Sequence, residues 1–385
     1  MTSQQRHRPG SLYLLALCSL AFTACVPSDA PDDPQEPPFV VRYTSERLEI
    51  GTDFDAKLCR GQFDLWEDQI DAIELHLGLS RESAWVYLYN DFEAIAQACH
   101  NDNSMAYVAG CWSGTVIYSE IKTVAHELVH AWAMSANPDP LPVLREGLAV
   151  RMSGPVSRPN GTYTVSGLLV TEVPPFEYSR ASHFVAWLMD TYGTDRFMDL
   201  YARTSRGSSA KALDAAARAA LGSDIEEVLA AYDNALPTYY PGMGAQACGA
   251  AAKVPWQGEA ATWEAITECD DGPLIGFEGG PWQRVVLDVP SDGVYVLDTV
   301  GPAAAMTHCL TVPTEEAALE PSNSLVADDW KYSEPLESWI FPYGWDYDEV
   351  WADQLLDLRA GTYEIWINNP GQMNLFDEPM SLRRM

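Results

Sequence analysis

Two histidines and a glutamate, in the run His126-Glu127-Leu128-Val129-His130, are the residues best placed to do chemistry. Residues 121–134 are predicted to form a helix that is closed by Asn137-Pro138. Helix positions four apart lie about 40° from each other around the axis, so both imidazoles can face one metal ion. Glu127 lies about 100° round from His126, where it can reach a water bound to that ion. The pattern predicts a metal-dependent hydrolase with Glu127 as general base.

Glu146 is the candidate for a third metal ligand. A catalytic zinc site takes three protein ligands and leaves one position for water. Glu146 follows His130 by sixteen residues, on a predicted helix over residues 144–152. A Pro-rich turn over residues 137–142 can fold the chain back so that this glutamate meets the histidines. We therefore expect one Zn²⁺ per chain, held by His126, His130 and Glu146. The short HExxH pattern also occurs by chance in unrelated helices, so its helical context and the later Glu carry weight.

The runs at 126–131 (HELVHA) and 146–149 (EGLA) resemble the gluzincin metallopeptidases, whose third ligand is a Glu on the next helix. Residues 178–188 with Tyr192-Gly193 are similar to the helix that follows in bacterial members of that group. The resemblance covers residues 40–235 and implies an α+β, thermolysin-like fold, one zinc ion and peptide-bond hydrolysis. The chain departs from thermolysin at Arg145 and Val150, where that enzyme has an Asn and a histidine-orienting Asp.

A donor to the tetrahedral oxyanion is the remaining part that such a reaction needs. The resemblance places Tyr178 near the metal and so implies this catalytic role, with Tyr163 and His183 as rivals. A half-buried Tyr178 with an ordinary hydrogen-bonded hydroxyl is the competing interpretation. A catalytically inert surface protein that binds a protein or glycan ligand is the alternative function for the whole chain.

The pattern along the chain changes near Tyr239. Before it, strands are expected at 39–44, 84–89 and 115–118, and helices at 63–77, 91–99, 182–192, 194–204, 209–221 and 223–236. Ser223 and Glu226 fit a capping box for the last helix, and residues 161–173 suggest a hairpin or extended segment. After it, strand-like runs at 284–289, 293–299 and 362–368 suggest a β-sandwich. The predicted domains are residues 40–245, α+β, and residues 255–385, all-β.

Two phrases of the C-terminal part are alike, at residues 290–295 (PSDGVY) and 358–363 (LRAGTY). They resemble the β-sandwich domains of the pre-peptidase C-terminal type that are appended to secreted bacterial peptidases. The implied role is binding or positioning rather than chemistry. Four tryptophans could form a ligand surface or fill the core: Trp330, Trp339, Trp345 and Trp351.

Residues 1–25 have the pattern of an export signal. A basic head precedes an apolar run over residues 12–22 that is too short to span a membrane. The run ends in Phe22-Thr23-Ala24-Cys25, which resembles a bacterial lipobox with Phe22 in place of the usual Leu. The resemblance implies lipidation of Cys25, and the Pro- and Asp-rich residues 26–39 form a tether. We expect a lipid-anchored protein of the cell envelope, or alternatively a secreted one.

Charge and cysteine content limit the partners and the compartment. The chain has 55 Asp and Glu against 23 Lys and Arg, a net charge of −32, which argues against nucleic-acid binding. The expected partner is a peptide or protein substrate, with contact to the membrane through the lipid anchor alone, and the expected state is a monomer. An even number of remaining cysteines in an exported chain suggests disulfides. Cys99–Cys111 is the simplest pair because it closes a short polar loop, and Cys59–Cys248 and Cys269–Cys309 come next.

Overall fold

The computed structural model of the chain has a mixed α+β fold, as the sequence predicts. It describes residues 39–55, 57–99, 109–114, 116–154, 156, 164–169, 177–235, 239–244, 253–264, 266, 269, 274–276, 282–298, 304–308, 348–350, 355–368 and 380–385. Tyr163, Cys25, Cys248, Cys309 and the four tryptophans from Trp330 to Trp351 lie outside these residues.

The N-terminal part is built on a sheet with strand order β1-β2-β3-β5-β4. The inner strands β2 (Leu48–Thr52), β3 (Ala84–Leu88) and β5 (Val116–Ser119) run parallel to one another. Strands β1 (Val40–Thr44) and β4 (Gly110–Trp112) pair antiparallel at the two ends of this order. The strands expected near 39–44, 84–89 and 115–118 are confirmed, whereas β2 and β4 were not predicted.

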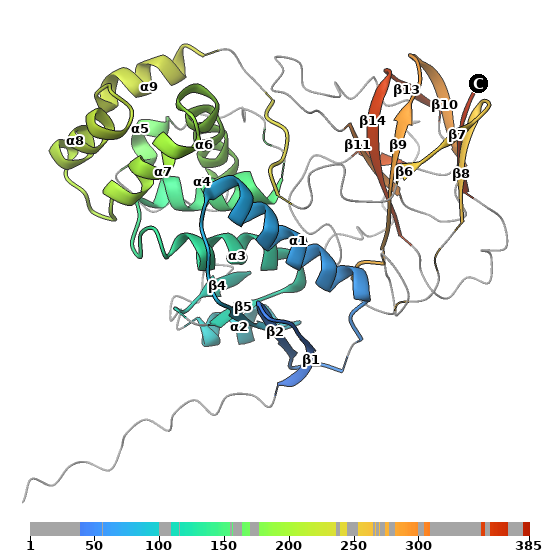
Figure 1. Ribbon diagram of the computed structural model, residues 1–385, viewed down its shortest axis with the longest axis horizontal. Coiled ribbons are helices and arrows are strands. Elements are labelled where there is room, and N and C mark those ends of the chain that lie inside the picture. The colour runs from blue at the N-terminus through green and yellow to red at the C-terminus, as the bar shows by residue number, and fades with distance from the viewer. Residues whose placement is uncertain are drawn as a thin grey trace, which may run out of the picture. The chain divides into compact units, whose positions relative to one another are not determined.

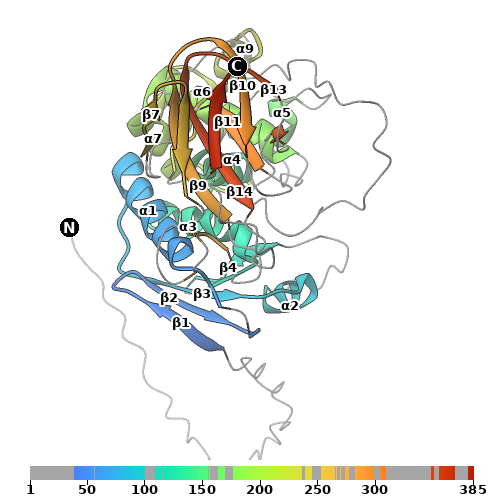
Figure 2. The ribbon, with the colours of Figure 1, turned by 90° about the vertical axis from the view of Figure 1, so that its right-hand side faces the viewer.

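Two helices cover one face of this sheet (Figure 2): α1 (Arg60–Leu77) and α3 (Val124–Ala133), which follows the 3-10 turn Ile121–Thr123. Alternation along the strands points Ile50, Val86 and Ile117 into one hydrophobic core with both helices. Helix α1 contributes Trp66, Ile70 and Ile73 to that core and ends at Gly78, whose φ of 65° suits a residue without a Cβ. The shared core therefore holds α3 in a fixed position on the sheet.

The other helices are α2 (Phe92–Ala98), α4 (Pro142–Ser153), α5 (Val165–Leu168), α6 (Tyr178–Tyr192), α7 (Thr194–Arg203), α8 (Ala210–Ala220) and α9 (Ile225–Asp233). Two predictions need correction. Helix α5 lies inside the segment expected to be extended. The capping box of α9 uses Asp224 and Glu227, one residue later than predicted, because Asp caps as well as Ser and a Glu stands at both possible positions.

The described strands of the C-terminal part form two sheets (Figure 1). One has the order β13 (Leu355–Leu358), β10 (Gly293–Asp298), β15 (Met380–Arg384), β8 (Ala260–Trp263), β7 (Trp256–Gln257). The other has the order β12 (Asp348–Val350), β11 (Ala304–His308), β14 (Gly361–Asn368), β9 (Trp282–Val289), β6 (Lys253–Val254). One buried cluster takes residues from both sheets, among them Leu297 and Leu382 of the first and Leu287 and Ile365 of the second. The sheets therefore pack face to face, which is the sandwich arrangement.

The two similar phrases noted in the sequence have the same local structure. The Tyr295 hydroxyl donates to the Ser291 carbonyl at 2.6 Å, and the Tyr363 hydroxyl donates to the Arg359 carbonyl at 3.2 Å. Each tyrosine is buried at the start of a strand and returns its hydroxyl to the preceding turn. The Ala360 backbone N–H donates to Asp292 Oδ1 at 2.8 Å, which joins the two turns.

A disulfide joins Cys59, directly before α1, to Cys269 near the sandwich. The predicted pairs Cys59–Cys248 and Cys269–Cys309 are therefore wrong, because each needs a cysteine that this bond occupies. Backbone hydrogen bonds from Cys59 to Gly276 and from Arg60 to Cys269, both 2.9 Å, accompany the bond. Cys99–Cys111, the local pair expected from the sequence, is confirmed.

The described residues from 39 to 385 belong to one compact unit, so these links lie within a single body. The division at residues 245–255 stays a prediction, although the main cluster lies between Leu48 and Tyr240 and the sandwich cluster between Ala261 and Leu382. No helix within the described part of the chain combines the length and apolar character that crossing a bilayer requires.

Candidate metal centre

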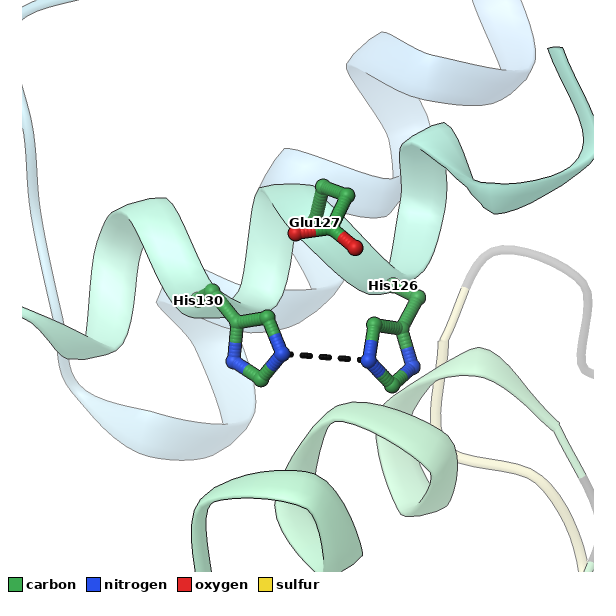
Figure 3. A group of neighbouring side chains, drawn as sticks. All are labelled: His126, Glu127 and His130. Carbon is green, nitrogen blue, oxygen red and sulfur yellow. Dashed lines mark hydrogen bonds between the residues drawn. The ribbon is translucent and has the colours of Figure 1, made fainter. Parts of the chain in front are cut away.

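The two histidines of the motif point the same way from α3 (Figure 3). His126 and His130 are one turn apart, and their facing Nε2 atoms are 3.0 Å from each other. Buried apolar residues of α3, including Leu128, Val129 and Trp132, fasten the opposite side of the helix to the core. Packing of the apolar face therefore fixes the direction of both imidazoles.

Glu146 reaches the histidines from α4. Pro142 occupies the start of this helix, where its missing N–H and fixed φ are tolerated. Glu146 Oε2 lies 3.3 Å from His126 Nε2 and 3.3 Å from His130 Nε2. Zinc bonds of about 2.0–2.1 Å place the ligand atoms of a tetrahedral site about 3.3 Å apart. The three atoms therefore have the separations of a His2Glu zinc shell, and the donor types also fit zinc.

Gly147 explains how α4 comes close enough to present Glu146. A Cβ at Gly147 would lie 2.5 Å from the Ala181 carbonyl oxygen and 2.6 Å from Val185 Cγ2, both on α6. No side chain fits in that space, so only glycine allows the two helices to approach this closely. The Gly that follows Glu146 in the sequence motif is thus a packing requirement.

Two carboxylates compete for the position of third ligand. The ligand atoms of His126, Glu127 and His130 lie within 4.8 Å of one another, so this group could also hold a metal ion. Glu146 is the better ligand, because one of its oxygens is already 3.3 Å from both imidazole nitrogens. With Glu146 as the ligand, Glu127 would lie beside the metal position, where a hydrolase needs a general base.

Strand β4 packs against the side chain of Glu127. A Cβ at Gly110 would lie 2.9 Å from both Cγ and Oε1 of Glu127 and 2.9 Å from Ser119 Oγ. The strand backbone therefore packs directly against the side chain of Glu127, a residue that is only 5% exposed. The Cys99–Cys111 disulfide ties the residue after Gly110 to the end of α2.

The charges of the cluster are strongly coupled. Burial raises the pKa of Glu127, and the nearby histidines oppose this effect only in part. Burial also acts to raise the pKa of Glu146, but the charge of His130 and hydrogen bonds to both histidines outweigh it, so that pKa lies well below its usual range. Burial acts to lower the pKa of His130, whereas Glu146 raises it and prevails. Glu146 therefore has the lower pKa of the two carboxylates, which suits a group that must bind a metal ion in its charged form.

Tyr178, at the start of α6, lies beside the cluster. Its ring is nearly parallel to that of His126, with centroids 5.9 Å apart and planes at 6°. Burial, followed by the charges of Glu146 and Glu127, raises the pKa of Tyr178, so the hydroxyl keeps its proton at neutral pH. His183 lies elsewhere: it is buried, and its Nδ1 is 2.9 Å from the Tyr232 hydroxyl. Among the described candidates for the oxyanion donor, Tyr178 lies beside the two histidines of the motif and His183 does not.

Two neighbours of the site were not predicted from the sequence. Arg145 Nε donates to Glu146 Oε1 at 2.7 Å, and Gly110 packs against Glu127. Adjacent helix residues normally point in different directions, so the spacing of Arg145 and Glu146 gives no signal of a contact. Gly110 belongs to a short strand without an alternating pattern, and its role depends on strand pairing.

A scan against models of known protein families finds no match, and a search of curated proteins finds none either. The geometry and chemistry of the candidate centre are therefore the basis for inferring a function.

Proposed function

We propose that this protein is a zinc-dependent hydrolase of peptide bonds, with His126, His130 and Glu146 as metal ligands. The observation that carries the proposal is the triangle of ligand atoms, with sides of 3.0, 3.3 and 3.3 Å, beside a second carboxylate. A structural zinc site is normally closed by four protein ligands, whereas the described residues at this site offer three and a general base. That combination favours catalysis over a purely structural role.

The side chains around the centre fit the steps of hydrolysis. A zinc ion bound there would lower the pKa of a coordinated water and polarise the substrate carbonyl. Glu127 accepts a proton from the attacking water and delivers it to the leaving nitrogen as the C–N bond breaks. The neutral Tyr178 hydroxyl donates a hydrogen bond to the oxygen that becomes negative in the tetrahedral intermediate.

The position of strand β4 at the end of its sheet favours a peptide as the substrate. In the described part of its sheet β4 is a terminal strand, paired with β5 alone. An extended peptide can add to such an edge through main-chain hydrogen bonds. Because Gly110 of β4 packs against Glu127, a peptide held on this strand would pass close to the metal ligands.

We place this activity outside the cytoplasm, on a protein anchored by lipid at Cys25. The disulfides Cys59–Cys269 and Cys99–Cys111 support an oxidising compartment, where such bonds persist. Mass spectrometry of the N-terminal peptide from a bacterial envelope fraction tests the anchor. A diacylated Cys25 is the expected result, and an unmodified N-terminus at or after this residue favours the secreted alternative.

The function is tested with the full chain and its Glu127→Gln variant, purified in mild detergent. Wild type is expected to hold about one zinc per chain and to cleave members of a mixed peptide library. Glu127→Gln should retain the zinc and lose at least about 100-fold in cleavage rate, because it removes the general base. A wild-type protein without stoichiometric zinc would contradict the metal centre. Zinc binding without cleavage of any peptide would favour the inert, ligand-binding alternative.

A further inference from the structure

The carboxylate of Glu146 divides its two oxygens between different partners. Oε2 faces the histidines, 3.3 Å from each Nε2 atom, whereas Oε1 accepts a hydrogen bond from Arg145 Nε at 2.7 Å. The glutamate side chain is only 6% exposed, and that of Arg145 is 26% exposed. A bond between a guanidinium and a carboxylate in such surroundings belongs to the stronger class of protein hydrogen bonds.

This contact is not one that a helix provides by default. Neighbouring positions are about 100° apart around the axis, so their side chains normally diverge. The Arg145 stem must therefore curve back over its own helix to place Nε on Glu146. An arginine side chain loses rotamer entropy when it is held in this way. Holding Arg145 in this way fixes the orientation of the Glu146 carboxylate.

We propose that Arg145 is a positioning residue that makes Glu146 present a single oxygen to the metal. The inference rests on the proposed zinc centre. Turning the carboxylate so that both oxygens faced the histidines would break the 2.7 Å bond to Arg145. Single-oxygen binding limits the protein to three ligand atoms and leaves the fourth position of a tetrahedral site for water. The guanidinium suits this task because it is planar and stays charged, whereas a lysine ammonium is a mobile point charge.

The test compares Arg145→Met and Arg145→Lys with a matched control, Arg203→Met, in the full chain. Arg203 Nε donates to Asp199 Oδ2 at 2.8 Å, a contact of the same kind on the surface of α7. Zinc affinity is measured by competition with a chelator. Both Arg145 variants should bind zinc about 10–100-fold more weakly, the usual effect of losing a partner that orients a ligand. Arg203→Met should stay within about twofold of wild type, since it leaves every ligand and its partner in place.

Cobalt in place of zinc gives a readout that a general loss of stability does not produce. The visible bands of Co²⁺ are intense at four-coordinate sites and weaken when a fifth ligand atom binds. Cobalt-loaded wild type should give the intense four-coordinate spectrum, and Arg145→Met the weaker five-coordinate one, because Glu146 can then use both oxygens. Should Arg145→Met fail to fold, Arg145→Lys keeps a positive charge and carries the same two measurements.

Several results would overturn the proposal. A zinc affinity of Arg145→Met within twofold of wild type means that Arg145 does not matter to the metal. Full recovery in Arg145→Lys means that charge alone suffices. An unchanged cobalt spectrum in Arg145→Met means that Glu146 does not change its mode of binding. If wild type binds no zinc, the proposed function fails together with this inference. If it binds zinc and the Arg145 variants behave as expected but no peptide is cleaved, only the hydrolase proposal fails.

Discussion

At the scale of single residues, Glu127 combines burial with a charge that the fold disfavours. It is among the buried polar residues, and burial raises its pKa above the ordinary value of a glutamate. The metal-free folded protein therefore holds this proton at pH values where the unfolded chain has lost it. Stability must then fall as the pH rises from about 4.5 through the raised pKa. A site that strains the fold in this way is common where chemistry requires it.

The substitution Glu127→Gln removes the cost in free energy of burying this charge. In metal-free protein it should raise the free energy of unfolding at pH 7 by about 0.5–2 kcal/mol, the usual range for such relief. The gain should shrink as the pH is lowered and disappear below about pH 4, where wild-type Glu127 is protonated in both states. Chemical denaturation at several pH values in the presence of a chelator measures it. Glu226→Gln, at an exposed position, controls for the change in net charge and should stay within about 0.5 kcal/mol throughout. A gain that is equal at pH 4 and pH 7 would exclude burial of the charge as its cause.

Sequence reasoning at this scale succeeds where the geometry is local. The directions of His126, Glu127 and His130 follow from helical spacing alone. Glu146 needs the turn before α4 to fold the chain back, which spacing permits but does not require. Arg145 contacts Glu146 through its side-chain Nε, and Gly110 reaches Glu127 through the pairing of β4 with β5. Neither leaves a pattern in the sequence, because the first contact depends on the conformation of the Arg145 side chain and the second on strand pairing.

At the scale of elements, the centre depends on how closely α4 crosses α6. Gly147→Ala would place its Cβ 2.5 Å from the Ala181 carbonyl oxygen, a backbone atom that cannot turn away. The helices must separate, and we expect a loss of about 1–3 kcal/mol in the free energy of unfolding. Because Glu146 is the preceding residue, zinc affinity should fall in the same variant. Thermal unfolding and zinc competition measure the two effects.

Gly167→Ala is the matched control for this variant. Gly167 also lies in a helix, α5, but the nearest atom to an added Cβ is Thr164 Oγ1 at 3.9 Å, an ordinary contact. This change should leave zinc affinity unaltered and stabilise the protein by up to about 1 kcal/mol, since Ala is the better helix former. Equal effects of the two substitutions would show that the α4–α6 crossing is not limiting.

Elements with a strong internal pattern were predictable. Helix α1 has an apolar face and an αL glycine after its last turn, and both features are visible in the sequence. The three-residue strand β4 has no such pattern, since its pairing with β5 makes it a strand. The start of α9 was misplaced by one residue, because two residues in succession are able to cap it. Local preference thus sets the type of element, and tertiary contacts decide short or ambiguous cases.

At the scale of the whole molecule, the α+β part and the sandwich are joined at α1. Leu65 of α1 packs in one buried cluster with Ile275, Trp282 and Trp366. Trp282 and Trp366 lie on the face of β9 and β14 that is opposite the sandwich core, because alternate residues of these strands enter that core. The Cys59–Cys269 disulfide lies in a second buried cluster beside them. We therefore expect the sandwich to unfold together with the part of the chain that carries the candidate metal centre.

Removal of that disulfide tests the connection. Cys59 and Cys269 are 210 residues apart, and Cys99 and Cys111 only 12. In the chain-entropy model the long link contributes about 5 kcal/mol and the short one about 3 kcal/mol, because the longer loop restricts the unfolded chain more. The variant with Cys59→Ala and Cys269→Ala should therefore lose about 2 kcal/mol more than the variant with Cys99→Ala and Cys111→Ala. Calorimetry of both should also show the unfolding transition of the sandwich separating from that of the α+β part in the first variant only. A single transition in both variants, with equal losses, would mean that noncovalent packing between α1 and the sandwich is sufficient to hold the two parts together.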